Sequence, residues 1–175
     1  MPIFERLAAL VACSVVGMAH AGEGPGLGEA VSDEQSSAID YTISVAGDGL
    51  PPGTGNAIAG AQVYAENCVA CHGAGGQDGI NDRLVGGQDS LDTANPLKTV
   101  GSYWPYATTI FDYVRRAMPY HAPGSLSNDK LYAVTAYLLH LHGIIGEDVE
   151  MNALTLPQVK MPNRDNFVRS YLQEP

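Results

Sequence analysis

The feature that most constrains this 175-residue chain is a pair of cysteines two residues apart with a histidine directly after them, Cys68-Val69-Ala70-Cys71-His72. Thiols at positions i and i+3 lie on one face of a helix, where each can add to one vinyl group at the same edge of a porphyrin. The histidine then turns inward beside the first cysteine, where its imidazole can reach the iron. The motif therefore predicts one covalently bound haem c, attached through Cys68 and Cys71, with His72 as an iron ligand.

The cysteine pair could also be a redox-active dithiol, half of a zinc site or a chance pairing. A thioredoxin-like pair opens a helix beside a strand, whereas this pair closes a predicted helix. A zinc site needs further cysteines or histidines at similar spacing, and the sequence contains no second pair of this kind. A disulfide within the pair would close almost no loop and would stabilise little. Covalent haem accounts for the spacing better than these alternatives.

A second iron ligand is expected from Met118, which stands directly before a proline at the end of a predicted helix. A thioether suits iron that cycles between two oxidation states, and it raises the reduction potential relative to a second imidazole. The competing ligands are Met161, which is also followed by a proline, Met151 and His121. Met118 could also be core filler, which is the usual role of methionine.

Several neighbouring residues are expected to have ordinary structural roles. His140 and His142 end a predicted helix, where positive charge suits the helix dipole. Trp104 belongs to an aromatic cluster of the kind that usually forms core, although its N–H could donate to a haem propionate. Arg115 and Arg116, the only adjacent basic residues in the sequence, are expected on a solvated helix face.

Apolar periodicity predicts three helices and hence an all-α fold. The first begins near Ala57 and runs through the cysteine motif. The second covers about residues 105–117, and the third runs from an N-cap at Ser127 to about His142. No internal repeat is visible, so we expect a single haem domain at residues 56–143.

Residues 1–21 are predicted to be a signal peptide that directs export to the periplasm. Arg6 precedes an apolar stretch too short to span a bilayer, and small residues follow it at the expected cleavage site. A stretch resembling a bacterial lipobox around Cys13 is the alternative, in which that cysteine would carry a lipid anchor. No other segment is long and apolar enough to predict a membrane span.

The segments on either side of the haem domain are rich in turn-forming residues and lack periodicity. Residues 22–55 are predicted to be an N-terminal arm, and residues 144–175 a wrapping C-terminal tail. The formal net charge of −10 argues against a nucleic-acid partner, because phosphates require clustered basic residues. An acidic surface instead favours docking onto a basic patch of a protein partner.

Taken together, these residues resemble the class I cytochromes c. Five features occur in the same order as in that family: Gly60, Tyr64, the cysteine motif, Met118 with Pro119, and a last helix carrying Tyr137. The resemblance implies three to four helices around one covalent haem, with the first and last helices crossing closely where Gly60 lies beneath Tyr137. In that family a proline after the motif often orients the proximal histidine. Residues 81–87 contain no proline, so the group that orients His72 is left open.

A narrower resemblance extends over both arms. The stretches that carry it are residues 49–53, 98–106, 115–119, 143–146 and 160–164. They are similar to the single-haem cytochrome c subunit of periplasmic sulfite dehydrogenases and of the related Sox-system sulfane dehydrogenase. This resemblance implies a non-catalytic electron carrier that accepts electrons from a molybdenum-cofactor dehydrogenase subunit and passes them to a downstream cytochrome or oxidase.

Two other functions compete with that interpretation. One is a free-standing shuttle cytochrome, which would need only the haem domain and not the long arms. The other is a haem enzyme or sensor with an open iron site, which a sixth ligand from Met118 disfavours because it leaves no position for a substrate.

Overall fold

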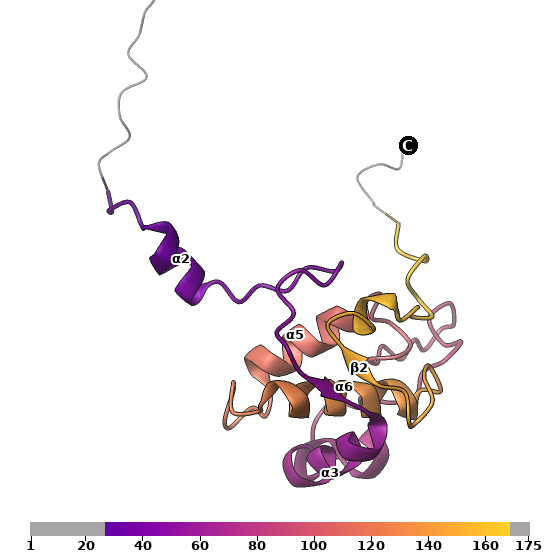
Figure 1. Cartoon of the computed structure of the whole chain (residues 1–175). Coiled ribbons are helices and arrows are strands. Elements are labelled where there is room, and N and C mark those ends of the chain that lie inside the picture. Colours follow the sequence, from indigo (N-terminus) through magenta and orange to yellow (C-terminus); the bar gives the residue numbers. More distant parts are fainter. Residues whose placement is uncertain (1–26, 169–175) are drawn as a thin grey trace, which may run out of the picture. The chain divides into compact units, whose positions relative to one another are not determined.

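The computed structural model describes residues 27–168, so the predicted signal peptide and Cys13 lie outside the described residues. The chain divides after Asp40 into two compact units. The described part of the first unit contains helix α2 (Asp33–Ile39; Figure 1). Ser32 and Gln35 form a reciprocal capping box at its start, in which each side chain accepts a hydrogen bond from the backbone N–H of the other.

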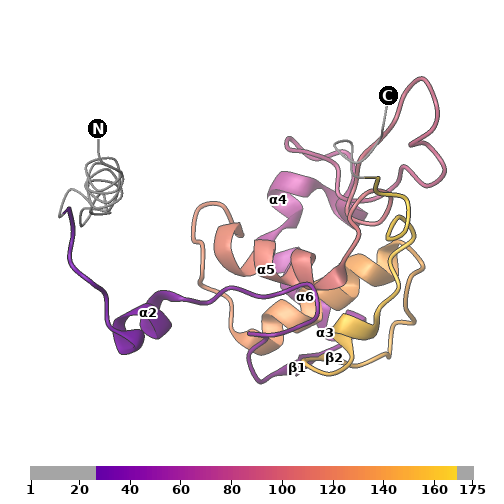
Figure 2. The same ribbon diagram turned by 90° about the horizontal axis from the view of Figure 1, so that it is seen from above.

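The regular secondary structure of the second unit is mostly helical, in agreement with the predicted all-α class (Figures 1 and 2). Its α-helices are α3 (Ala57–Asn67), α4 (Val69–His72), α5 (Ala107–Ala117) and α6 (Asn128–Leu141). Short 3-10 turns cover Ala74–Gly76 and Leu156–Gln158. Strand β1 (Thr54–Gly55) pairs antiparallel with β2 (Met151–Asn152), Thr54 lying opposite Asn152. No helix within residues 27–168 is long and apolar enough to cross a membrane.

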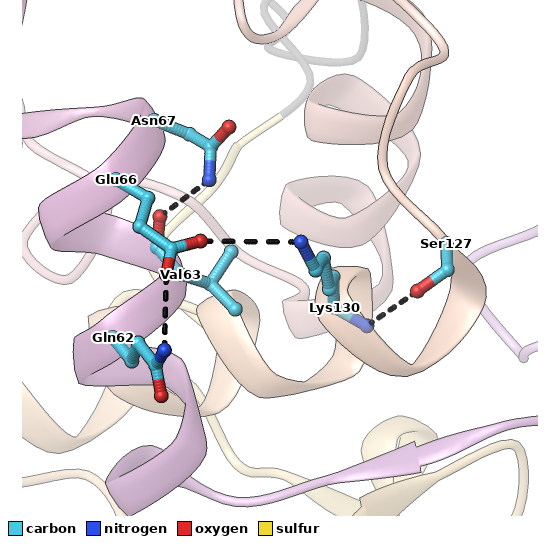
Figure 3. Close-up of polar contacts among 6 residues, drawn as sticks. All are labelled: Gln62, Val63, Glu66, Asn67, Ser127 and Lys130. Carbon is cyan, nitrogen blue, oxygen red and sulfur yellow. Dashed lines mark hydrogen bonds and ion pairs between the residues drawn. The ribbon is translucent and has the colours of Figure 1, made fainter.

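The ends of the helices follow from their capping residues. The side chain of Asn56 accepts a hydrogen bond from the Ala59 N–H (3.0 Å) at the start of α3. Ser127 caps α6 as predicted, accepting from the Lys130 N–H (3.4 Å; Figure 3). Helix α5 ends at Ala117, and the backbone of Met118 after it is extended because the following residue is a proline.

The prediction of one continuous helix through the cysteine motif is wrong. Helix α3 ends at Asn67, and Cys68 has non-helical angles (φ −123°, ψ −34°) before the separate turn α4 begins. The Asn67 side chain donates a hydrogen bond to the Val63 carbonyl (2.8 Å; Figure 3). Side-chain bonds of this kind compete with the backbone hydrogen bonds that would continue a helix. The motif therefore occupies its own turn, and Gly73 at positive φ ends it.

Helix α6 lies at the centre of the second unit, packed against α3, α5 and the small sheet (Figure 1). The sequence predicted one apolar stripe on this helix, but eight of its fourteen residues are buried. Its contact with α3 is closest at Gly60, where an added Cβ would overlap the carbonyl oxygen of Ala133. The rings of Tyr64 and Tyr137 pack beside this crossing with centroids 5.3 Å apart.

Replacing Gly60 with alanine should therefore lower the free energy of unfolding by about 1–3 kcal/mol, because overpacking forces the two helices apart. Urea denaturation measures this change. Helix propensity alone predicts the opposite sign, a gain of about 1 kcal/mol. Gly146→Ala is the control, since its Cβ would meet only Asp148 Oδ1, at 3.3 Å, and a Val149 methyl group, at 3.4 Å. A Gly60→Ala protein more stable than the wild type would contradict the close crossing.

Both flanking segments contribute to the second unit. Met151, Leu156, Val159 and Met161 from the predicted C-terminal tail are buried in the same core as the helices. On the N-terminal side, the Tyr132 hydroxyl donates to the Pro51 carbonyl (2.9 Å). The pairing of β1 with β2 then joins the two flanking segments to each other.

Candidate haem site

A cavity of about 490 Å³ opens within the second unit, a size within the roughly 300–1,000 Å³ of ligand and cofactor sites. Its lining includes all four residues predicted to hold haem, Cys68, Cys71, His72 and Met118. The first three come from the turn that follows α3, and Met118 comes from the end of α5. Elements far apart in sequence thus meet at one cavity.

The two thiols are free and partly exposed at this cavity. Burial raises the pKa of Cys68 to about 11, and the neighbouring Cys71 contributes to this rise. A redox-active pair needs a lowered pKa, because the thiolate is the reactive form. Cys68 is instead protonated at neutral pH, which disfavours the dithiol alternative. Within residues 27–168, no cluster of three or more Cys, His, Asp or Glu side chains could hold a metal ion.

The structure identifies the group that orients His72. The Nδ1 atom of His72 lies 2.8 Å from the backbone carbonyl oxygen of Asp82. Because a carbonyl oxygen only accepts, Nδ1 carries the proton in this contact and donates it. The Nε2 atom is then left with a free lone pair, which is the form that binds a metal.

The loop that brings Asp82 to His72 is fixed by hydrogen bonds near the motif. The Asn81 N–H donates to the Cys71 carbonyl (2.9 Å), and the Tyr64 hydroxyl donates to the Gly73 carbonyl (3.0 Å). Burial, with smaller contributions from Cys68 and Tyr137, raises the pKa of Tyr64 to about 12. Tyr64 therefore keeps its proton and remains a donor.

The competing sixth ligands separate by position. Met118 is partly buried and lines the cavity, and exposed His121 lines it too. Met151 and Met161 are 2% and 1% exposed, belong to the hydrophobic core and do not line the cavity. The core-filler role that methionine commonly has thus applies to Met151 and Met161.

Three further cavity residues could meet the carboxylates of a cofactor. Trp104 lines the cavity and packs edge-on against Tyr113, with ring centroids 5.6 Å apart. Arg83 and Lys98 also line it, and neither received a role from the sequence. Both stand in irregular loops without periodicity, so only their position in the fold shows that they reach the site.

Arg115 and Arg116 do not line this cavity. Their guanidinium carbons lie 5.5 and 4.5 Å from the centre of the Tyr41 ring, and Arg116 also pairs with Asp112 (2.8 Å). Arg115 is half-buried rather than fully solvated as predicted. These contacts tie the start of the second unit to α5.

Comparisons with known proteins agree with this geometry. A family model described as Cytochrome c matches residues 57–142. A chain in the crystal structure of the sulfane dehydrogenase SoxCD from Paracoccus pantotrophus is 37% identical, with a TM-score of 0.75 over 86% of this chain and 79% of that chain. The chain belongs to the cytochrome c family. Membership implies covalently bound haem c, and the predicted class I fold and the likeness to the sulfane dehydrogenase are confirmed.

A second relative of this cytochrome c is a thiosulfate dehydrogenase from Psychrobacter arcticus (strain DSM 17307 / VKM B-2377 / 273-4). It is 28% identical over an alignment of 120 positions, and the match covers 61% of this chain. The matched part spans 33% of the length of that dehydrogenase. The likeness therefore concerns a portion of the larger protein.

Proposed function

We propose that this cytochrome c carries single electrons on one haem c and is the electron-accepting subunit of a molybdenum-dependent sulfur dehydrogenase. One observation supports the electron-transfer role most directly. The cavity brings Cys68, Cys71 and His72 together with Met118. Two cysteines can attach a haem covalently, and a histidine and a methionine can supply two ligands to its iron. Likeness to the sulfane dehydrogenase SoxCD supports the choice of enzyme.

Each residue has a separate task in this proposal. Haem c supplies the one-electron chemistry when it is bound. Cys68 and Cys71 would hold it covalently, His72 would ligate the iron through Nε2, and Met118 would ligate it through Sδ. The Asp82 carbonyl holds the proton on Nδ1 of His72, which keeps Nε2 available for the iron.

The cavity wall also tunes the site. Apolar side chains of Val100, Val134 and Leu138 line the cavity and are nearly fully buried. They exclude water and disfavour added positive charge, which raises the reduction potential. Two protein ligands would leave the iron without an open position, and this favours electron transfer over substrate binding.

The segment before the second unit offers a surface for the dehydrogenase. Leu27, Val31 and Ile39 are 86%, 62% and 72% exposed within one short segment, and exposed apolar side chains that gather in this way mark candidate interaction sites. A partner subunit would cover them. The predicted signal peptide at residues 1–21 would place the complex in the periplasm, where a downstream cytochrome or oxidase would take the electrons.

Deleting residues 27–40 is expected to reduce co-purification with the molybdenum dehydrogenase at least tenfold and to leave the haem spectrum unchanged, because these residues lie outside the unit that carries the haem site. Co-expression followed by affinity purification measures the complex. A triple Leu27→Ser, Val31→Ser, Ile39→Ser variant should behave like the deletion. The double Asp33→Asn, Glu34→Gln variant is the control and should bind normally.

Equal binding by the full-length and deleted proteins would show that this segment is not the interface. If neither form binds and the cytochrome is still reduced at full rate by other dehydrogenases, the free-shuttle function takes precedence.

A second function is suggested by the likeness to the thiosulfate dehydrogenase, in which the cytochrome itself would oxidise a sulfur compound. Thiosulfate added to the purified ferric cytochrome, without any molybdenum protein, distinguishes the two. Rapid reduction of the haem would support a catalytic role. No reduction would support the carrier role.

A further inference from the structure

His142 is not one of the predicted haem ligands, and its ring links the two ends of a loop that covers residues 84–101. It directly follows α6, and its Nε2 atom lies 3.0 Å from the Leu84 carbonyl oxygen and 3.1 Å from the Gly101 backbone nitrogen. Its Nδ1 atom lies 3.1 Å from the Nε2 position of the Gln88 amide, which exchanges with the amide oxygen when the amide rotates. The ring therefore contacts residues 84, 88 and 101, which belong to the long segment between α4 and α5.

That segment forms one wall of the haem cavity. Leu84 lines the cavity, as do Lys98, Thr99 and Val100 near the end of the segment. The Val100 N–H donates to the Leu84 carbonyl (3.2 Å), so the two ends are already joined once. The His142 ring adds a second connection, from α6 to both ends.

The contact with Gly101 is closely fitted. A Cβ added at Gly101 would overlap the Cγ and Nδ1 atoms of the His142 ring. Among the described residues, the Gly101 N–H has only one hydrogen-bond acceptor, the Nε2 atom of that ring. The Leu84 carbonyl, in contrast, has the Val100 N–H as another partner.

One ring nitrogen cannot serve both contacts at once. When Nε2 has a lone pair it accepts from the Gly101 N–H, and when Nε2 carries a proton it can only donate to the Leu84 carbonyl. Burial lowers the pKa of the His142 ring below its ordinary value of 6.5, and the contact with Leu84 opposes this shift. Lowering the pKa favours the neutral ring near neutral pH. With its proton on Nδ1, that ring donates to the Gln88 amide through the amide oxygen and accepts from the Gly101 N–H at Nε2.

We propose that His142 is a positioning residue that holds the loop of residues 84–101 against the haem cavity, and that protonation of its ring releases Gly101. The inference rests on the proposed function, because it takes the cavity as the haem site. The loop stays joined at Leu84 and Val100 when the ring is protonated. Only the end near residues 98–101 is loosened.

Charged neighbours do not hold His142 in either state, since it forms no ion pair within residues 27–168. The charged residues of the loop nearest to its contacts are Arg83, Asp89 and Lys98. On α6 the nearest titratable residue is His140, whose ring faces the Ile145 carbonyl (3.3 Å).

The sign of the pH dependence follows from the lowered pKa. The unfolded chain binds a proton near pH 6.5, whereas the folded chain binds it only at lower pH. The contribution of His142 to stability is therefore fully present above pH 6.5. It is lost as the pH falls through the lower pKa of the folded protein.

Amide hydrogen exchange of the holoprotein, followed by NMR, tests the proposal. Protection of the Gly101 N–H, corrected for the intrinsic rate, should fall about tenfold as the pH is lowered from about 8 through the depressed pKa of His142, as expected for the loss of one hydrogen bond. Protection of the Val100 N–H should stay constant. In His142→Leu the Gly101 N–H should be unprotected at every pH.

Conservative variants make the test independent of folding defects. His142→Gln keeps a carbonyl oxygen near the position of Nε2 that cannot be protonated, so the Gly101 N–H should stay protected at all pH values. His140→Gln is the control in the same helix turn and should keep the wild-type pH dependence. Gly101→Ala should displace the ring and mimic His142→Leu.

The reduction potential is the readout that a purely structural role would not move. It should change with pH over the same window in the wild type and in His140→Gln, and it should be flat over that window in His142→Gln. Gly101 protection that does not depend on pH, or that persists in His142→Leu, would overturn the proposal. Failure of the proposed function is seen separately, as a polypeptide without covalent haem.

Discussion

Replacing both Cys68 and Cys71 with serine is expected to yield a polypeptide that carries no covalent haem. Both thiols line the cavity beside His72, and without them no thioether bond can form. Mass spectrometry measures the result directly, because the mature wild-type chain should be heavier than its polypeptide by one haem. The wild type should also keep its pigment through acid–acetone extraction, and the double variant should lose it.

The third cysteine supplies a matched control. Cys13 lies in the predicted signal peptide, so Cys13→Ser should leave the haem content of the mature protein unchanged. The same variant tests the lipobox alternative. If Cys13 carries a lipid anchor, the wild type is found in the membrane fraction and Cys13→Ser moves to the soluble fraction. Extraction of haem from the wild-type protein by acid–acetone would overturn the covalent assignment.

Local sequence patterns predicted the parts of the fold that depend on local chemistry. Helix α6 begins after its N-cap at Ser127, and α5 ends just before Met118, because capping and the restriction before a proline act over a few residues. The pairing of β1 with β2 joins segments almost a hundred residues apart and only two residues long. No periodic pattern can show strands of that length.

The candidate site shows the same division. Four side chains at the cavity could be predicted, because thiol, imidazole and thioether chemistry depends on residue type. The partner of His72 could not be predicted, since it is the backbone carbonyl of Asp82 and every residue carries such a group. The break at Cys68 was also missed, because the positions of residues 57–71 fit one helical face well.

Burial distinguishes two methionines that the sequence pattern treats alike, and Met118 as the iron ligand stays a prediction. Met118 and Met161 are each followed by a proline, so the local pattern treats them alike. In the fold, Met118 lines the cavity while Met161 packs in the core at 1% exposure. The same substitution at the two positions should therefore have different effects.

Met118→Ala is expected to abolish the weak red charge-transfer band that a thioether gives with ferric haem iron, and to lower the reduction potential because a thioether favours the reduced iron. Met161→Ala should keep the band and instead lower the free energy of unfolding by about 2–5 kcal/mol, through the cavity left in the core. Absorption spectra, redox titration and urea denaturation of both variants measure these effects. The opposite pattern would transfer the ligand to Met161. A wild-type protein with two imidazole ligands and no such band would assign the sixth position to His121, which lines the same cavity.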